Sequence, residues 1–180
     1  MKIGLIRHFK VKHPHKRFMT SVEFAEWVEG YDIAEVEENA VNLENIKWEK
    51  CYVSDLPRAI KTAETIFKDE LIKTELLREV PISPVINTKL KIPFVLWFLL
   101  GRLAWLFSHK SQSENVKQTN KRVLSLMKIL TNLNEKNVLI ASHGFLIFVL
   151  QKELFKNGFM GRKIRKVRNG ILYIYQKGKE

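Results

Sequence analysis

The stretch Ile3–His8, which reads IGLIRH, constrains this chain most, because a short apolar run ends abruptly on an arginine and a histidine. The apolar part predicts a buried strand. Ligands of open α/β sheets bind outside the carboxyl ends of the strands, so Arg7 and His8 mark a candidate site. Arginine binds anions through a planar fork of donors, and neutral histidine offers a nucleophilic or proton-transferring nitrogen. Taken alone, the pattern also describes a surface strand end with two solvated residues.

A second apolar run, Asn137–Ser142, ends in the same way on His143, and Gly144 allows a tight turn into the next apolar segment. Because two separate strands end on histidines, a functional site explains the pattern better than a surface strand end with solvated residues. Parallel strands place their carboxyl ends at one edge of a sheet, where the histidines would meet.

A third run, Cys51–Ser54, leads into a helix that carries Pro57 in its first turn, where the missing N–H costs nothing. Ser54 or Asp55 is the expected cap. Arg58 then lies at a helix N-terminus, which attracts anions through its backbone N–H groups and the helix dipole. The three strand ends together predict a binding site for one anion.

These motifs resemble, in order and spacing from residue 3 to about residue 150, those of the histidine phosphatase superfamily, the phosphoglycerate mutase-like proteins. The matching segments are Arg7-His8, Ser54–Ala63 with the second arginine, Leu77–Glu79 with the proton donor, and Ser142–Gly144 with the second histidine. Two departures stand out. The family usually has glycine where this chain has Phe9, and the glycines that often follow the acidic residue are absent after Glu79.

The resemblance implies a role for five side chains. His8 would attack phosphorus and form a phosphohistidine. Arg7, Arg58 and His143 would bind the phosphoryl oxygens. Glu79 would protonate the leaving oxygen and later activate water, with Glu114 or His143 as the next candidates for the acid. The implied substrate is a small phosphorylated molecule, and these steps need no metal and no cofactor.

The formal net charge of +12 could indicate a nucleic-acid, membrane or anionic-substrate partner. Basic residues gather at 10–17 and 162–168, and acidic residues at 23–49. No nucleic-acid-binding motif accompanies the basic runs, so we expect no nucleic-acid partner. A solvated basic face that also attracts phosphorylated molecules explains the charge better.

Metal binding is disfavoured, although His13 and His15 follow His8 closely. The loop 9–17 contains no Asp, Glu or Cys to complete a coordination shell. The single cysteine, Cys51, favours a reducing compartment, and the N-terminus has a strand pattern rather than that of a signal peptide. We therefore expect a cytoplasmic protein.

The apolar segment Ile92–Phe107 is the most unusual part of the sequence. Its 16 residues fall short of the ~20 that span a bilayer, and Arg102 lies inside it. We expect an apolar helical insertion at about 92–110 that is buried or forms a subunit interface. A peripheral membrane contact or a homodimer through 94–107, and a lid that selects substrate, stay open.

The remaining patterns predict one α/β domain over residues 1–180, a three-layer αβα fold with a mostly parallel central sheet. Further expected elements are a helix from the capping box at Thr20 to about Glu29, an acidic helix over 32–45, an extended segment over 76–83, a long helix opened by Ser111–Glu114, and an edge strand over 170–176.

A metal-independent phosphatase is the favoured function. Mutases of the family are generally longer and clamp substrate with additional segments, so a phosphoglycerate mutase is the alternative within the family. From another class, a catalytically idle scaffold could bind phosphate or a membrane through Trp97, Trp105 and the basic runs.

Overall fold

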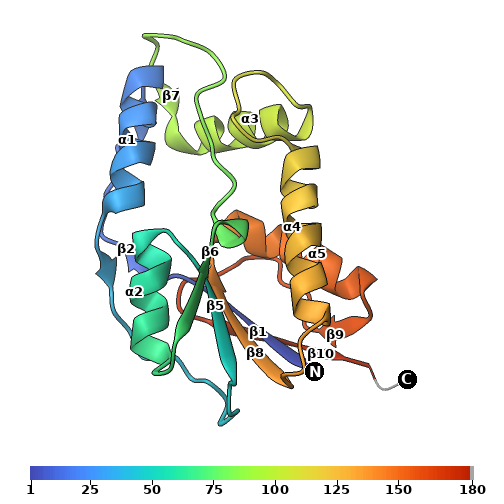
Figure 1. Ribbon diagram of the computed structural model, residues 1–180. Helices are drawn as coiled ribbons and strands as arrows, with labels where there is room; N and C mark the ends of the chain where they lie inside the picture. The colour runs from blue at the N-terminus through green and yellow to red at the C-terminus, as the bar shows by residue number, and fades with distance from the viewer. Residues whose placement is uncertain (179–180) are drawn as a thin grey trace. The chain divides into compact units, whose positions relative to one another are not determined.

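The structure, a computed structural model, describes residues 1–178 and divides into two compact units. The larger unit comprises residues 1–10, 36–79 and the chain from Arg122 onward, and the smaller unit comprises residues 11–35 and 80–121. The elements in chain order (Figure 1) are β1 (Lys2–Arg7), β2 (Lys10–Val11), β3 (Phe18–Met19), α1 (Ser21–Ile33), β4 (Val36–Glu37), β5 (Lys50–Ser54), α2 (Pro57–Ile66), β6 (Leu71–Thr74), the 3₁₀ helix η1 (Glu75–Leu77), β7 (Ile92–Pro93), α3 (Phe94–Leu106), α4 (Val116–Thr131), β8 (Asn137–Ser142), α5 (Gly144–Lys156), β9 (Phe159–Gly161) and β10 (Leu172–Lys177).

The larger unit is built on a mixed sheet whose strand order, within the described residues, is β6-β5-β8-β1-β10-β9. The first four strands run parallel, which confirms the expected α/β class with a mostly parallel sheet. β1 and β8 are neighbours and pair Arg7 with Ser142. β5 lies on the other side of β8 and pairs Val53 with Ala141. The carboxyl ends of β1, β8 and β5, which the sequence singled out, therefore lie side by side at the same end of the sheet.

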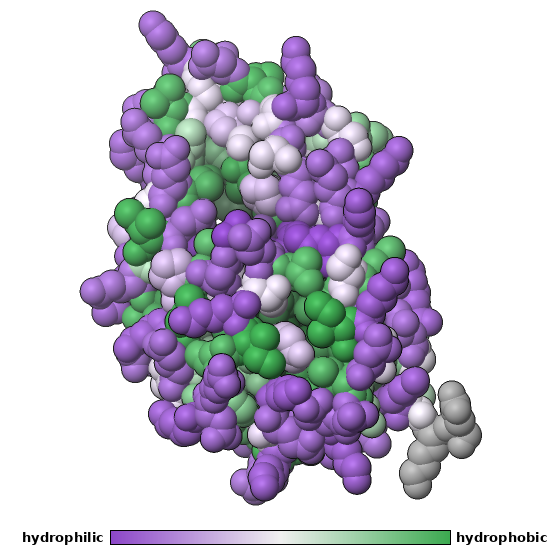
Figure 2. All heavy atoms as spheres, in the orientation of Figure 1, coloured by the Kyte–Doolittle hydropathy of each residue, from purple (hydrophilic) through white to green (hydrophobic). Residues whose placement is uncertain are grey.

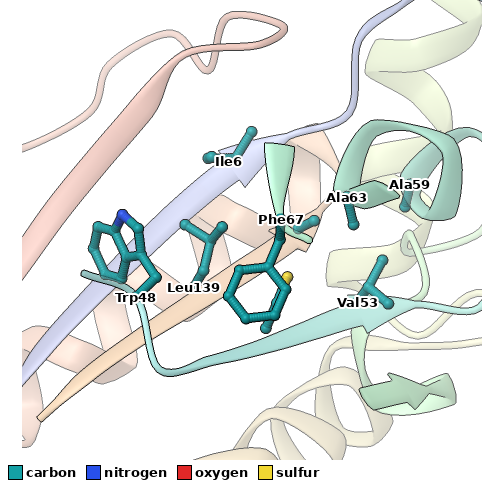
Figure 3. Packing of buried hydrophobic residues seen from close by; sticks show 9 residues of the cluster. Ile6, Trp48, Val53, Ala59, Ala63, Phe67 and Leu139 are labelled. Atoms are coloured by element: carbon teal, nitrogen blue, oxygen red, sulfur yellow. The ribbon is translucent and has the colours of Figure 1, made fainter. Parts of the chain in front are cut away.

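Helix α2 covers one face of this sheet. Ala59 and Ala63 of α2 pack on a cluster formed by alternate strand residues such as Val53 and Leu139 (Figure 3). Small side chains on the helix allow it to approach the strands closely. The strand residues that point to the opposite face, such as Leu5 and Ile140, are also fully buried, and α5 lies on that side (Figure 1). The larger unit thus has the three expected layers.

The C-terminal strand β10 is not the edge strand that the sequence predicted. It pairs with β1 on one side and with β9 on the other. The edge is β9, a short strand after α5 that lacked a recognisable sequence pattern. Gly161 makes this pairing feasible, because a Cβ there would lie 2.7 Å from the Tyr175 ring.

The acidic helix expected over 32–45 is wrong. Only α1 extends into this region, and β4 and a loop follow it. Glu44 and Asn45 have positive φ angles of 56° and 51°, and the Asn42 side chain accepts the Glu44 amide at 2.8 Å. A local side-chain bond therefore stabilises a turn at the expense of a helix.

In the smaller unit, α1 begins with the predicted capping box. The Thr20 hydroxyl accepts the Glu23 amide, and the Glu23 carboxylate accepts the Thr20 amide. The helix does not end at about Glu29 as expected but continues through Gly30 to Ile33. A Cβ at Gly30 would lie 2.8 Å from the His13 ring, so this glycine permits close packing instead of ending the helix.

Helix α4 begins later than the sequence predicted, at Val116. The capping residues are Asn115, whose side chain accepts the amides of Lys117 and Gln118, and Gln118, whose side chain accepts the Asn115 amide. The long helix was predicted correctly, but the capping box predicted at Ser111–Glu114 does not form its N-terminus. The region predicted as extended, 76–83, begins inside η1 and otherwise contains no helix.

The apolar segment forms α3, and its two tryptophans point into the smaller unit. Trp97 donates to the Met19 carbonyl at 3.0 Å and stacks on Phe24, and Trp105 donates to the Thr119 hydroxyl at 2.9 Å. Both indoles are buried, so they are core residues. No helix in the described part of the chain is both long and apolar enough to cross a membrane. On the face drawn in Figure 2, hydrophilic residues cover most of the surface, with hydrophobic groups between them.

Candidate active site

His8 lies directly after β1 and is 1% exposed. Its amide donates to the Ser142 carbonyl at 2.9 Å, which ties it to the neighbouring strand end. Its Nδ1 lies 2.6 Å from the Phe9 carbonyl. Because a carbonyl only accepts, Nδ1 carries the proton of the neutral ring, and the basic nitrogen is Nε2.

The side chain of Phe9, the residue in place of the family's usual glycine, is buried. Its amide donates to the Thr62 hydroxyl at 2.8 Å, and that hydroxyl donates to the Arg58 carbonyl at 2.8 Å. The Asn169 side chain donates to the His8 and Phe9 carbonyls at 2.8 and 3.2 Å. The peptide after His8 is therefore held on both sides, and the phenyl ring packs into the protein.

The positive charges of two arginines affect the protonation of His8. Burial, and then the positive charges of Arg58 and Arg7, lower the pKa of His8 from 6.5 to about 3. The imidazole is consequently neutral at pH 7, as a nitrogen nucleophile requires.

Arg58 lies in the first turn of α2 and is 2% exposed. The helix begins at Pro57 as predicted, but the expected cap is wrong. The N-cap residue is Leu56, and it makes no side-chain capping bond within the described residues. Ser54 and Asp55 have other partners: Ser54 contacts His143, and Asp55 forms an ion pair with Arg78.

Arg7 reaches across the end of β1 toward the start of α5. Its Nη1 donates to the Val167 carbonyl at 3.1 Å, and a Cβ on Gly144 would lie 3.2 Å from its Cζ. Among the described residues, the buried Arg7 Nε has no hydrogen-bond partner. A buried guanidinium donor of this kind is suited to an anionic acceptor.

His143 is fully buried, and its Nε2 lies 2.8 Å from the Ser54 hydroxyl oxygen. This hydroxyl already accepts the Leu56 amide at 3.3 Å and has its own proton to donate. A neutral His143 that accepts this proton at Nε2 carries its remaining proton on Nδ1, which has no partner among the described residues. Burial first, and then repulsion by a protonated His8 and by the charges of Arg58, Arg7 and Arg122, hold the pKa of His143 well below its usual value. His143 is thus a neutral, buried imidazole, and in this tautomer its Nδ1–H is a hydrogen-bond donor.

Glu79 caps α5, the helix that follows His143. Its two carboxylate oxygens accept the amides of Phe145 and Leu146 at 3.1 and 3.0 Å. The carboxylate thereby occupies a helix N-terminus, where negative charge is favoured. Glu79 therefore binds the N-terminus of α5, and the Arg7 guanidinium lies close to Gly144 at the same end of this helix.

The backbone that leads to Glu79 is held through three of its consecutive carbonyl groups, each of which accepts a hydrogen bond from another element. Arg122 Nη1 donates to the Leu76 carbonyl at 3.0 Å and to the Arg78 carbonyl at 2.7 Å. The buried Ser142 hydroxyl donates to the intervening Leu77 carbonyl at 2.9 Å. We call these contacts the carbonyl clamp. It connects α4 and β8 to the segment that carries Glu79.

The structure thus brings together the predicted residues Arg7, His8, Arg58 and His143, and attaches Glu79 to the adjoining helix. Sequence reasoning assigned no site function to the side chains that support them: Ser54, Thr62, Arg122, Ser142 and Asn169. Thr62 had a signal, because it lies four residues after Arg58 on the same helix face. Arg122 and Asn169 had none, since their contacts depend on the tertiary fold.

The two loop histidines belong to the smaller unit and have structural partners. His13 Nε2 lies 3.1 Å from the Trp27 carbonyl, and His15 stacks on Phe94 with ring centroids 4.0 Å apart. In the described part of the chain, no group of three or more His, Cys, Asp and Glu residues is arranged to hold a metal ion.

A family model described as histidine phosphatase superfamily (branch 1) matches residues 5–177. Phosphoglycerate mutase from Bacillus anthracis str. Sterne has a similar fold, with a TM-score of 0.64 and 19% identity over 97% of this chain and 88% of the mutase. A mycobacterial glucosyl-3-phosphoglycerate phosphatase gives a TM-score of 0.55 with 17% identity over 86% of this chain and 79% of that protein. No curated protein matches the sequence.

Proposed function

The chain belongs to the histidine phosphatase superfamily, branch 1, and from this membership we propose that it is a phosphatase that hydrolyses a phosphomonoester through a phosphohistidine on His8. The observation that carries the proposal is the state of His8. The ring is buried beside Arg58 and Arg7, its Nδ1–H is bound to the Phe9 carbonyl, and its pKa is lowered to about 3. A neutral imidazole with an unprotonated Nε2 is the nucleophile that this chemistry needs.

The phosphoryl group would bind through its non-bridging oxygens. The Arg7 and Arg58 guanidinium groups and His143 Nδ1–H would donate to them, because these are buried donors next to the nucleophile. These oxygens carry the charge of the transferred group, so catalysis depends mainly on positioning and electrostatic stabilisation.

In the first step, His8 Nε2 would form a bond to phosphorus as the bond from phosphorus to the ester oxygen breaks. Glu79 would give that oxygen its proton, so that an alcohol leaves. To do so, the carboxyl group must be protonated and exchange at least one of its amide contacts for the substrate. In the second step, water would attack the phosphohistidine while Glu79 accepts its proton, which releases inorganic phosphate and restores His8.

The direct test is to trap the intermediate. Brief exposure to a radiolabelled phosphate ester, followed by an alkaline quench, should leave acid-labile phosphate on His8. The His8→Ala variant should be inactive and unlabelled while keeping the circular dichroism spectrum of the wild type. Label on another residue, or turnover without label, would remove the proposed nucleophile.

The products distinguish this proposal from its alternatives. A mutase returns the phosphoryl group to a second hydroxyl of its substrate, whereas a phosphatase transfers it to water, so release of inorganic phosphate should account for all turnover. A catalytically idle phosphate-binding protein would bind vanadate without turning over an aryl phosphate, with or without a chelator present.

A further inference from the structure

The outer face of α3 is entirely apolar. Val95, Leu99, Leu103 and Leu106 follow one another at helical spacing, and Leu96 and Phe107 widen the stripe. These six side chains are between 38% and 76% exposed. We call them the α3 stripe.

The opposite face of the same helix is already used inside the smaller unit. Trp97 packs in a cluster with Met19 and Phe24, and Gly101 lies close to Ile82, where a Cβ would clash with the isoleucine side chain. The residues of the α3 stripe are therefore not part of this hydrophobic core. A surface helix normally presents polar residues on its outer side, and an exposed apolar patch marks an interaction surface.

The charge of the segment that contains α3 favours one kind of partner. Residues 80–113 contain no Asp or Glu. Exposed Lys89 and Lys91 precede the helix and exposed Lys110 follows it. Arg102 points inward, where its guanidinium donates to the Val80 and Pro81 carbonyls. Lysines thus flank an apolar stripe at both ends, and no carboxylate in this segment opposes them.

We propose that the α3 stripe docks on an anionic lipid surface, with α3 lying in the plane of the interface and its flanking lysines on the headgroups. The helix has 13 residues. This length is too short to span a bilayer, but it suits a helix that lies in the interface with its apolar face turned to the lipid. Anionic headgroups attract basic residues next to such a helix.

A second copy of the chain fits this surface less well. A two-fold pairing of stripes in antiparallel orientation would place Lys89 and Lys91 beside the partner copy's Lys110, and a parallel pairing would place like lysines together. Both arrangements oppose positive charges across the contact, which disfavours association.

The test is co-sedimentation of the full chain with vesicles. Vesicles of equal parts phosphatidylglycerol and phosphatidylcholine should bind the protein, pure phosphatidylcholine should bind it at least about tenfold more weakly, and about 0.5 M salt should reduce the difference. Leu99→Ser combined with Leu103→Ser, and separately Lys89→Glu combined with Lys91→Glu, should each lower binding by roughly tenfold or more. The matched control is Leu124→Ser with Ile129→Ser, which changes two exposed apolar residues of α4 and should bind as the wild type does.

Three outcomes would overturn the proposal. They are binding that is equal for the two lipids, no binding at all, or a dimer in light scattering that the Leu99 and Leu103 changes dissociate, which would assign the stripe to a second copy. The His8→Ala variant should bind vesicles normally, so the result is independent of the proposed chemistry.

Discussion

The imidazole rings of His8 and His143 lie 5.1 Å apart, centroid to centroid, at a tilt of 54°. Each ring is buried close to Arg7 and Arg58, and each has a lowered pKa. Both histidines therefore stay neutral at pH 7, His8 with an unprotonated Nε2 and His143 with an N–H to donate. The fold achieves this by burying both imidazoles close to two arginines, because burial and positive charge both disfavour imidazolium.

The first prediction concerns stability against pH. The unfolded chain binds a proton at His8 near pH 6.5, and the folded chain does so near pH 3. Between these values the unfolded state holds more protons, so this histidine makes the folded protein less stable as pH falls, by up to about 1.4 kcal/mol per pH unit. Urea unfolding of the wild type and of His8→Asn between about pH 4 and 7 should show a shallower slope for the variant. Equal slopes would contradict the buried, neutral state of His8.

The second prediction concerns anion binding. Arg7→Ala and Arg58→Ala each remove a charge-assisted donor worth about 1.5–3 kcal/mol, so vanadate should bind roughly 10- to 150-fold more weakly to each variant. Isothermal calorimetry measures the change. Lys61→Ala is the matched control, because Lys61 lies on the same helix but forms an exposed ion pair with Glu38. Vanadate affinity that survives both arginine changes would show that the two do not share an anion.

The third prediction concerns Gly144. A Cβ at this position would lie 3.2–3.3 Å from the Cζ and Nε atoms of Arg7, which must shift to accommodate it. Gly144→Ala should therefore weaken competitive inhibition by phosphate in the wild type but have little further effect in Arg7→Ala. Additive effects in this double-mutant cycle would mean that the glycine acts through something other than the guanidinium.

The fourth prediction concerns Glu79 as the general acid. An alkyl alkoxide must be protonated as it leaves, whereas nitrophenolate leaves readily as the anion. Glu79→Gln should thus slow alkyl phosphate turnover far more than nitrophenyl phosphate turnover, and the pre-steady-state burst of each leaving group should locate the selective loss in the phosphorylation step. Equal losses for both leaving groups in that step would move the acid role elsewhere.

The structure adds a second effect of this substitution. Glu79 accepts two backbone amides, and a glutamine offers one oxygen for them and turns an NH₂ toward the other. Glu79→Gln should also lower the free energy of unfolding, by about 1–3 kcal/mol. Rates must therefore be compared at a temperature where urea titration shows the variant to be folded.

The fifth prediction concerns the carbonyl clamp. Ser142→Ala and Arg122→Ala release carbonyls on the peptide that leads to Glu79, so alkyl phosphate turnover should fall more than either nitrophenyl phosphate turnover or vanadate affinity does. Asn137→Ala is the control, because Asn137 donates to the Lys47 carbonyl at 3.0 Å from the opposite end of β8. It should not alter the ratio of alkyl to nitrophenyl turnover. If Asn137→Ala changes this ratio as Ser142→Ala does, the clamp is only a stabilising contact.

The sequence by itself determined the parts of this protein that depend on local pattern. Apolar runs that end on Arg7-His8 and on His143 predicted strands whose ends carry the site, and Pro57 marked the helix that presents Arg58. The two strands and the helix were confirmed, because strand burial and helix initiation are governed by residues close together in the chain, whereas the function of the site stays a prediction.

Local patterns were insufficient wherever a distant contact decided the outcome. Gly30 continues a helix because it packs on His13, β10 is an interior strand because β9 pairs with it, and the tryptophans of α3 turn inward to Met19 and Thr119. In the same way, the neutral charge state of His8 and the capping role of Glu79 exist only in the folded chain. Burial, neighbouring charge and hydrogen-bond partners from other strands and helices set them, and none of these can be read from the order of residues alone.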